Sequence, residues 1–338
     1  MVVHTTVDLS KYSSMNIGGI ANKIVEIQST SEIEAACKDS SRILVIGEGT
    51  NTIFKSEKYE QTFLQLSTKG IKLEDTVITA QAGEHWDEVV EAATNAGLYG
   101  IEFLSKIPGS VGAAPIQNIG AYGQELSDTL VSLQAYDLQE SKFVDLTRDQ
   151  CDFGYRTSRF KSRDTGRFII TEITLQLNTV PSGKPLYSTL QKYMADNSIT
   201  GTGLQDIRET LIKWRSEYLP DPSVIPNCGS FFTNPIISTQ EFEAIVAKYP
   251  ELLDHPTTWY WEVTGGGIKI AAGRLADTIG LKDWQDDDSG FATWKNSALV
   301  VVNNSAKNYS QLANFKQKYL DSFEKEFGIR LQQEPLEL

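Results

Sequence analysis

Residues 101–126, with the sequence IEFLSKIPGSVGAAPIQNIGAYGQEL, decide how the rest of the chain is organised. The stretch contains four glycines and two prolines, which disfavour a helix interior because glycine costs about 1 kcal/mol and proline about 3 kcal/mol relative to alanine. Its many isoleucine, leucine, valine and phenylalanine side chains need burial, so it is also a poor solvated linker. A buried, irregular backbone must have its amide groups satisfied. The composition leaves two interpretations open: a wall against a large flat ligand with phosphates, or a buried connection between two domains.

The whole chain has 338 residues, of which 40% are hydrophobic and 22% charged. This is an ordinary globular composition, and the chain is long enough for two or three domains. The net charge of −13 disfavours binding to nucleic acid or to an anionic membrane, but leaves a small phosphorylated ligand possible. The sequence has neither an apolar run of about 18 residues nor a signal-peptide pattern. We therefore expect a cytoplasmic protein with no nucleic-acid or membrane partner.

Cysteine and histidine are both sparse. The three cysteines, Cys37, Cys151 and Cys228, are scattered and odd in number, which predicts reduced thiols. The three histidines lie far apart without the spacing of metal ligands, so we expect no metal site. The same scarcity makes a Ser-His-Asp hydrolase an unlikely class.

Upstream of the central stretch, an apolar run at 43–46 (ILVI) leads into the sequence GEGTNT at 47–52. The continuous β-branched run predicts a buried strand. Glycine lets backbone N–H groups approach a pyrophosphate, and threonine adds donors, so residues 47–52 could form an anion cradle. The sequence lacks the third glycine of a dinucleotide-binding fingerprint. A tight turn between strands therefore remains the alternative.

The remaining periodicity predicts a mixture of strands and helices. Alternating and β-branched patterns predict strands at 23–28, 71–74, 77–80, 130–138, 142–146, 168–177 and 298–302, and a terminal strand that carries a carboxylate. Apolar spacings of three and four residues predict a short helix from residue 33 and helices at 84–96, 185–197, 204–218, 239–248, 271–279 and 309–327. The sequence TGGG at 264–267 predicts a turn.

A cationic and aromatic cluster follows in FGYRTSRFK at 153–161. Two arginines, a lysine and aromatic side chains in nine residues indicate a positive, aromatic-lined surface in an otherwise acidic chain. The planar guanidinium of arginine is suited to binding a carboxylate through two hydrogen bonds. A solvated strand edge is the alternative.

A lone serine stands between glycine and aromatic residues in NCGSFFTNP at 227–235. No Gly-x-Ser-x-Gly elbow is present, so the sequence does not indicate a hydrolytic nucleophile. Taken alone, Ser230 is most simply a turn residue.

Five short stretches, four of them described above, occur in an order that resembles one family. GEGTN at 47–51, IPGSVGAAPIQNIGAYGQEL at 107–126, FGYRTSRFK at 153–161, LPDP at 219–222 and GSFFTNP at 229–235 resemble the UDP-N-acetylenolpyruvoylglucosamine reductase (MurB) family. The resemblance covers nearly the whole chain, and the chain is similar to the longer, type I form of the family. It implies an α+β, three-domain FAD-binding fold of the vanillyl-alcohol-oxidase-like type. The implied units are two FAD-binding subdomains, 1–68 and 69–218, and a substrate-binding domain, 219–338, with a C-terminal catalytic strand.

The resemblance also implies the chemistry. NADPH would reduce FAD, and the enolpyruvyl ether of UDP-N-acetylglucosamine enolpyruvate would then be reduced to give UDP-N-acetylmuramate, a peptidoglycan precursor. The protein would act as a monomer. Other FAD oxidoreductases or oxidases on this fold, and a non-catalytic flavin-binding protein, are the alternatives.

The residues that match the family motifs receive roles only through the resemblance. Arg156 matches the arginine that binds the substrate carboxylate, Ser230 the proton donor, and Glu334 the C-terminal catalytic glutamate. The implied FAD contacts are Gly47, Glu48, Gly49, Thr50, Asn51, Thr52, Pro108, Gly109, Ser110, Gly112, Ala113, Ile116, Asn118, Ile119, Gly120 and Ala121. The implied substrate contacts are Tyr122, Tyr155, Tyr187, Arg215, Tyr218 and Asn234.

The chain departs from the family pattern at three places. Tyr218 stands before LPDP where lysine is usual, so Arg215 or Lys213 could hold the UDP diphosphate instead. The segment WKNSA at 294–298 replaces one that usually contains histidine or glutamine. Near the terminus, Glu337 is close enough to Glu334 to compete for the catalytic assignment.

Overall fold

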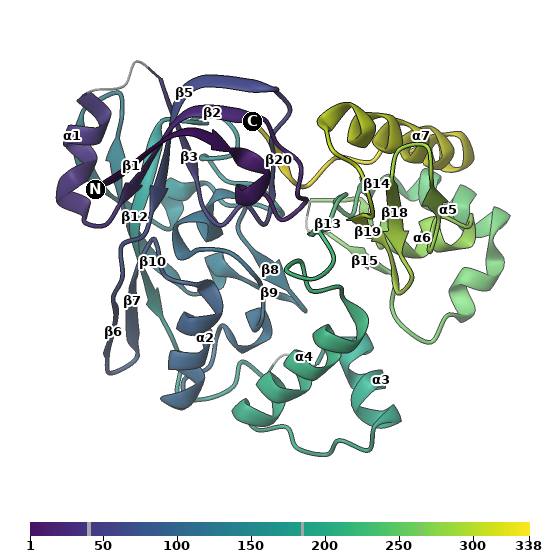
Figure 1. Ribbon diagram of the computed structural model, residues 1–338. Helices are drawn as coiled ribbons and strands as arrows, with labels where there is room; N and C mark the ends of the chain where they lie inside the picture. The colour runs from purple at the N-terminus through teal and green to yellow at the C-terminus, as the bar shows by residue number, and fades with distance from the viewer. Residues whose placement is uncertain (39–41, 184–185, 264) are drawn as a thin grey trace.

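The first part of the chain forms a four-stranded mixed sheet in the computed structural model, which describes residues 1–38, 42–183, 186–263 and 265–338 (Figure 1). The sheet order is β1-β2-β5-β3, with β1 antiparallel to β2 and the other two pairs parallel. Its elements are β1 (Val2–Asp8), β2 (Ile20–Ile27), β3 (Ile43–Ile46) and β5 (Lys58–Leu66), with the helix α1 (Ile33–Lys38). The prediction that 43–46 is buried is wrong, because β3 lies at the sheet edge and Val45 is 39% exposed.

The second part is a five-stranded antiparallel sheet in the order β11-β10-β12-β7-β6. Its strands are β6 (Ile71–Glu74), β7 (Val77–Gln81), β10 (Leu130–Asp137), β11 (Lys142–Thr147) and β12 (Phe168–Gln176). The helix α2 (Trp86–Asn95) buries the predicted apolar face of Trp86, Val89, Val90 and Ala93 in the same core. All of these elements were predicted, with shifts of one or two residues at their ends.

The stretch 101–126 is irregular, as its composition requires. It contains the 3₁₀ turns η3 (Glu102–Leu104) and η4 (Val111–Ile116) and the short hairpin of β8 (Gly120–Ala121) and β9 (Gln124–Glu125). The N–H groups of Val111 and Gly112 donate to the carbonyls of Glu84 and Ala82, both at 2.9 Å. A Cβ atom at Gly112 would lie 2.7 Å from the Cβ of Ala82, so only glycine permits this close approach.

Two helices form a separate lobe in Figure 1, α3 (Ser188–Asp196) and α4 (Leu204–Tyr218). They pack on Phe103 of the central stretch. Arg208 on α4 forms a bidentate ion pair with Asp87 on α2, with its shorter contact at 2.7 Å. Within the predicted helix 185–197, Pro185 lies outside the described residues.

The C-terminal part combines two sheets and three helices (Figure 1). The larger sheet has the order β13-β19-β18-β17 and the smaller one the order β14-β16-β15. Their strands are β13 (Asn227–Ser230), β14 (Ile236–Ile237), β15 (Tyr260–Glu262), β16 (Ile268–Ile270), β17 (Gln285–Asp286), β18 (Phe291–Trp294) and β19 (Ser297–Asn303). The helices are α5 (Thr239–Lys248), α6 (Ala272–Thr278) and α7 (Tyr309–Phe327). In the predicted turn 264–267, residue 264 lies outside the described residues, and the three glycines all have positive φ.

The last residues return to the first part of the chain. The strand β20 (Leu336–Glu337) pairs in parallel with β4 (Thr52–Ile53), directly after the predicted anion cradle. The hydroxyl of Tyr59 donates to the backbone oxygen of Leu338 at 2.8 Å. Residues Met15, Ile17 and Ile53 from the first part are completely buried in the core of the C-terminal part. The two ends of the chain therefore share packing as well as a sheet.

Short 3₁₀ segments complete the fold. They are η1 (Leu9–Tyr12), η2 (Thr30–Glu32), η5 (Leu126–Asp128), η6 (Asp149–Cys151) and η7 (Pro250–Asp254). Among the helices in the described ranges, none has the length and apolar character needed to cross a bilayer.

Candidate active site

The two predicted FAD segments face each other. In the described structure, none of the backbone N–H groups of residues 47–51 donates to a protein acceptor. Gly49 has φ 69°, and a Cβ atom there would lie 1.8 Å from the carbonyl oxygen of Tyr12. The Thr50 hydroxyl donates to the carbonyl of Pro108 at 3.4 Å, and a Cβ atom at Gly47 would meet Ser110 Oγ at 2.6 Å. Consecutive free N–H groups in a glycine-rich turn form an anion-binding nest, so the residues present fit a pyrophosphate.

The one carboxylate of this cradle is paired with a histidine that the sequence did not single out. The Glu48 carboxylate is hydrogen-bonded to Nδ1 of His85, the residue that precedes α2. His85 also forms an isolated bridge with Ser110. Glu48 is therefore directed toward His85, while its backbone N–H stays available to an anion. A lone histidine without metal-ligand spacing gave no sequence signal for this contact.

Not every predicted FAD residue presents its side chain to a ligand. Asn118 is completely buried, and its amide donates to Glu125 Oε2 at 2.7 Å while its Oδ1 accepts from the N–H of Ser127 at 2.9 Å. It stabilises the turn before β8. Ile116 and Ile119 are partly buried against the core between the five-stranded sheet and α2. These three residues can therefore shape the cofactor wall, but the Asn118 amide is already satisfied by protein groups.

Arg156 and Glu334 meet at the other end of the stretch. Nε of Arg156 lies 3.1 Å from Oε1 of Glu334, and Nη2 of Arg156 donates to the carbonyl of Gly120 at 2.7 Å. Arg156 adopts φ 53° in the tight turn where Gly154 and Thr157 exchange backbone hydrogen bonds. The two side chains are 20% and 13% exposed. The site thus holds a partly buried cation and carboxyl next to the predicted flavin wall.

Ser230 reaches the same place through backbone pairing. It is the exposed last residue of β13, and the carbonyl of the next residue, Phe231, accepts the N–H of Glu334 at 2.9 Å. The N–H of Phe231 in turn donates to Leu299 on β19 at 2.7 Å. The structure therefore brings the segments of Ser230 and Glu334 side by side, with Arg156 against Glu334.

Glu337, the competing carboxylate, lies elsewhere. It belongs to β20 and forms an ion pair with Lys316 on α7 at 2.7 Å. Lys316 also donates to Oε1 of Gln333 at 3.0 Å. Of the two glutamates, only Glu334 is placed against Arg156.

Aromatic side chains close one side of the site. Tyr122, with φ 51°, makes edge contacts with Tyr187 at 6.1 Å and with Trp214 at 5.7 Å between ring centroids. Tyr187 stacks on Trp261 of β15 at 5.9 Å. Burial raises the pKa of Tyr187 to about 12 and also raises the pKa of Tyr122, against the opposing effect of the nearby Arg215. Both phenols are therefore neutral hydrogen-bonding groups at neutral pH.

Tyr155 and Asn234 lie between Arg156 and the C-terminal part of the chain. The guanidinium of Arg156 lies 5.4 Å from the ring centroid of Tyr155, and Nζ of Lys269 lies 4.6 Å from the same centroid. Burial raises the pKa of Tyr155, although Arg156 acts in the opposite direction. Asn234 accepts the N–H of Ala272 at 3.0 Å through Oδ1. Lys269, which the sequence did not mark, therefore joins this cationic and aromatic surface.

Tyr218, the last residue of α4, packs its ring back on Trp214 of the same helix and not on Tyr187. Its ring stacks on Trp214 at 5.3 Å with an interplanar angle of 14°, and the residue is 41% exposed. A cavity of about 280 Å³ lies beside Tyr187, and its lining includes the cations Arg274 and Lys282 but not Tyr218, Arg215 or Lys213. Lys282 is paired there with Asp277 at 2.6 Å. The sequence did not single out either of these cations.

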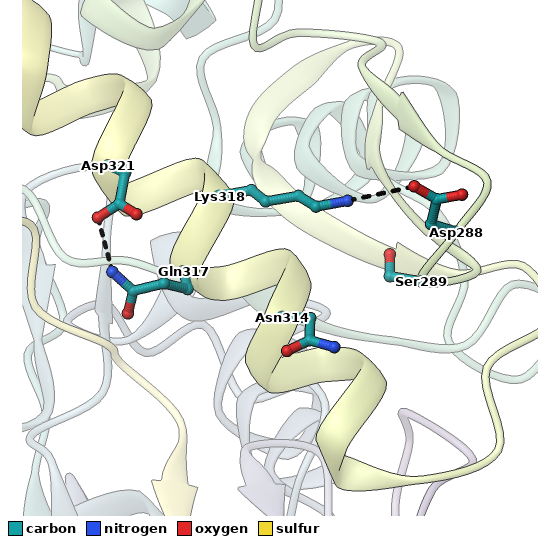
Figure 2. A pocket seen from close by; sticks show the side chains of 6 residues that line it. All are labelled: Asp288, Ser289, Asn314, Gln317, Lys318 and Asp321. Atoms are coloured by element: carbon teal, nitrogen blue, oxygen red, sulfur yellow. Dashed lines mark hydrogen bonds and ion pairs between the residues drawn. The ribbon is translucent and has the colours of Figure 1, made fainter.

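A further cavity of about 430 Å³ lies along α7 and contains none of the predicted site residues (Figure 2). In Figure 2, Lys318 points toward Asp288, at 3.7 Å, and Gln317 donates to Asp321 at 2.6 Å. None of the residues assigned to FAD or substrate lines it, so it does not compete with the site around Arg156.

Two family models match successive parts of the chain. The model described as "FAD binding domain" matches residues 21–147, and the model described as "UDP-N-acetylenolpyruvoylglucosamine reductase, C-terminal domain" matches residues 221–337. Together with the anion cradle, these matches define an FAD-dependent oxidoreductase with an α+β fold, as the sequence predicted.

Full-length relatives narrow the class. The UDP-N-acetylenolpyruvoylglucosamine reductase of Shewanella sediminis is 32% identical, over 99% of this chain and 96% of its own. That of Ralstonia nicotianae is 33% identical, over 97% of both chains. The crystal structure of the enzyme from Thermus caldophilus has the same fold, with a TM-score of 0.69 at 20% identity, over 100% of this chain and 99% of its own. The chain belongs to the UDP-N-acetylenolpyruvoylglucosamine reductase family, the FAD- and NADPH-dependent enzymes of peptidoglycan precursor synthesis.

Proposed function

We propose that this chain reduces UDP-N-acetylglucosamine enolpyruvate to UDP-N-acetylmuramate with NADPH, and that Arg156, Ser230 and Glu334 are its catalytic residues. The observation that carries these roles is the 3.1 Å approach of Arg156 to Glu334, beside the segment of Ser230. Bound FAD would supply the hydride-transfer chemistry that links NADPH to the β carbon of the enolpyruvyl group. Residues 47–52 and 108–113 would hold its pyrophosphate and linker.

Arg156 would bind the substrate carboxylate. Hydride addition at the β carbon breaks the C=C π bond and leaves negative charge that spreads into this carboxylate. A fixed guanidinium and a protonated Glu334 would stabilise that charge, because preorganised donors at the developing charge are usually the largest catalytic contribution. The hydrogen bond from Arg156 to Gly120 and the tight turn at 154–157 support the necessary rigidity.

Ser230 would complete the reduction. Its Oγ–H gives a proton to the α carbon, which forms the lactyl C–H bond, and the serine then recovers a proton from solvent. The exposed position of Ser230 at the end of β13 supports this exchange. The balance is one hydride from NADPH and one proton from solvent for each double bond reduced.

The cavity beside Tyr187 would bind the UDP diphosphate. Arg274 and Lys282 bring two positive charges against the single carboxylate of Asp277, which pairs with both, and threonine, serine and asparagine side chains supply donors. Arginine and lysine both bind phosphate oxygens through charge-assisted hydrogen bonds. The cavity would replace the contact that the family's usual lysine makes at position 218.

The three predicted units, 1–68, 69–218 and 219–338, would meet at this site. Among the described residues, five of the six sheets each lie within one of these ranges, and the pairing of β20 with β4 joins the last unit to the first. We propose a monomeric enzyme, as the family resemblance implies.

The test uses purified holoenzyme and follows flavin absorbance in two steps. NADPH should bleach the flavin, and UDP-N-acetylglucosamine enolpyruvate should then restore its absorbance. Ser230→Ala should leave bleaching unchanged and slow the restoration by about 10²–10⁴-fold, the usual contribution of a positioned proton donor. Reoxidation by oxygen alone, with no response to the substrate, would instead indicate an oxidase.

A further inference from the structure

Two side chains outside the proposed catalytic set connect directly to Glu334. Nε2 of Gln117, in the central stretch, donates to Oε1 of Glu334 at 3.0 Å. Nζ of Lys161 donates to Oε1 of Gln117 at 2.9 Å and to the backbone oxygen of Glu334 at 3.0 Å. Burial lowers the pKa of Lys161, so its amino group has been withdrawn from water to make these contacts. The three residues form a closed polar network.

This network fixes which way the Gln117 amide points. An ammonium group has only donors, so the oxygen of the amide must face Lys161 and its NH₂ group must face Glu334. Without Lys161, the amide could turn and present its oxygen to the glutamate. Lys161 therefore determines that Glu334 Oε1 receives a hydrogen bond from Gln117.

The two carboxyl oxygens of Glu334 are consequently different. Oε1 accepts from Gln117 and is approached by Nε of Arg156, whereas Oε2 has no hydrogen-bond partner among the described residues. In a neutral carboxyl group one oxygen is an acceptor and the other carries the proton. Because Oε1 already accepts from Gln117, it is the accepting oxygen, and Oε2 is the oxygen that would carry the proton of the neutral form.

The backbone of Glu334 is held at both ends as well. Its N–H donates to Phe231, and its carbonyl accepts from Lys161. These bonds fix the backbone of residue 334, while the hydrogen bond from Gln117 holds its carboxyl group. Positioning by such supporting hydrogen bonds is how proteins keep a catalytic group in its productive geometry.

We propose that Gln117 and Lys161 are positioning residues for Glu334, which hold Oε1 as the accepting oxygen and leave Oε2–H as the donor offered to the substrate. This inference rests on the proposed function of Glu334. Neither residue touches the reacting atoms, and both act through the orientation of the glutamate. The pair would matter only in the step in which substrate is reduced.

The experiment measures the two half-reactions separately in the holoenzymes of Gln117→Leu, Lys161→Met and Lys161→Arg. Gln117→Leu and Lys161→Met should leave flavin reduction by NADPH unchanged and slow reoxidation by UDP-N-acetylglucosamine enolpyruvate at least about tenfold, part of the ~10²–10³-fold contribution of a preorganised hydrogen-bond donor. Lys161→Arg keeps the charge and the donors, so it should retain most of the reoxidation rate.

A matched control is available on the same C-terminal segment. Lys316 on α7 also donates to a glutamine and a glutamate of this segment, through the side chains of Gln333 and Glu337, and among the described residues it makes no hydrogen bond or ion pair with Glu334. Lys316→Met should keep both half-reactions. Loss of both half-reactions in Gln117→Leu, an unchanged reoxidation rate, or an equal fall in Lys316→Met would overturn the inference. Failure of the unmodified enzyme to be reoxidised by the substrate would instead refute the proposed function.

Discussion

Arg156 and Glu334 come from distant parts of the sequence, and Nε of Arg156 lies 3.1 Å from Oε1 of Glu334. Arg156 is held on the FAD-binding side by Gly120, and Glu334 on the C-terminal side by Phe231. The site therefore exists only while the C-terminal segment remains docked on the FAD-binding part. The predictions below test the residues that make or surround this contact.

Replacing Glu334 should affect turnover far more than replacing Glu337. Glu334→Gln should lower kcat by about 10²–10³-fold because an amide is a weaker donor than a carboxyl group to the charge that develops beside Arg156. Glu337→Gln removes only a partly exposed ion pair with Lys316, which is worth about 1 kcal/mol or less. Steady-state kinetics and thermal unfolding of both variants provide the measurement, and a larger kinetic effect at Glu337 would transfer the catalytic assignment to it.

The proposal that the cavity beside Tyr187 binds the UDP diphosphate predicts different effects for changes at Arg274 and at Tyr218. Arg274→Met should raise KM for the UDP substrate about tenfold or more, since a charge-assisted hydrogen bond is worth about 1.5–3 kcal/mol. Tyr218→Lys, which restores the family's usual residue, should leave KM unchanged because Tyr218 stacks on Trp214 outside the cavity. A lower KM for the UDP substrate in Tyr218→Lys would show that the diphosphate lies near α4.

FAD retention should depend on Gly109. This residue has φ 124°, and a Cβ atom there would lie 3.1 Å from the Thr50 hydroxyl, so Gly109→Ala strains the wall and narrows the cradle at once. The variant should purify with less FAD and bind it more weakly. Gly97→Ala is the control: its φ is 75°, but a Cβ atom would meet nothing within 4 Å. Equal loss of flavin in both variants would mean that backbone strain alone is responsible.

Stability in acid should depend on the buried Asp137. Hydrogen bonds from Arg167 lower the pKa of Asp137 below its ordinary value of 3.8. A carboxyl with a depressed pKa in the fold stabilises the protein above its unfolded pKa, and this contribution is lost as the pH falls through the folded pKa. Asp137→Asn should thus reduce the free energy of unfolding by about 1.5–3 kcal/mol at pH 7.

The difference in free energy of unfolding between the unmodified protein and Asp137→Asn should shrink as the pH falls below 3.8, the ordinary pKa of Asp137. Urea unfolding of both proteins at neutral and acidic pH measures it. A difference that stays constant across this range would show that Asp137 acts through packing instead of charge.

The sequence predicted most of the elements because their periodicity is local. Helices α4, α5 and α7 begin and end where the apolar spacing indicated. The edge position of β3 could not be predicted, since a run of four apolar residues looks the same at the edge of a sheet as at its centre.

The site was only partly predictable for a related reason. The motifs placed Arg156, Ser230 and Glu334 in recognisable surroundings, but Gln117 and Lys161 act through contacts with residue 334 that depend on the docking of the C-terminal segment. The same holds for Arg274 and Lys282, which become neighbours of Tyr187 only in the folded chain. No local pattern marks a side chain whose partner comes from another part of the sequence.

The completely buried residues Met15, Ile17 and Ile53 belong by sequence to the first unit and by packing to the interior of the last one. Asn303 on β19 strengthens this junction by donating to the carbonyl of Met15 at 2.8 Å. Two regions that share one interior cannot lose their structure independently, because melting either one uncovers the apolar surface of the other. The beginning and the end of the chain therefore constitute one cooperative unit, and a fragment made of residues 219–338 alone would lack part of its own core.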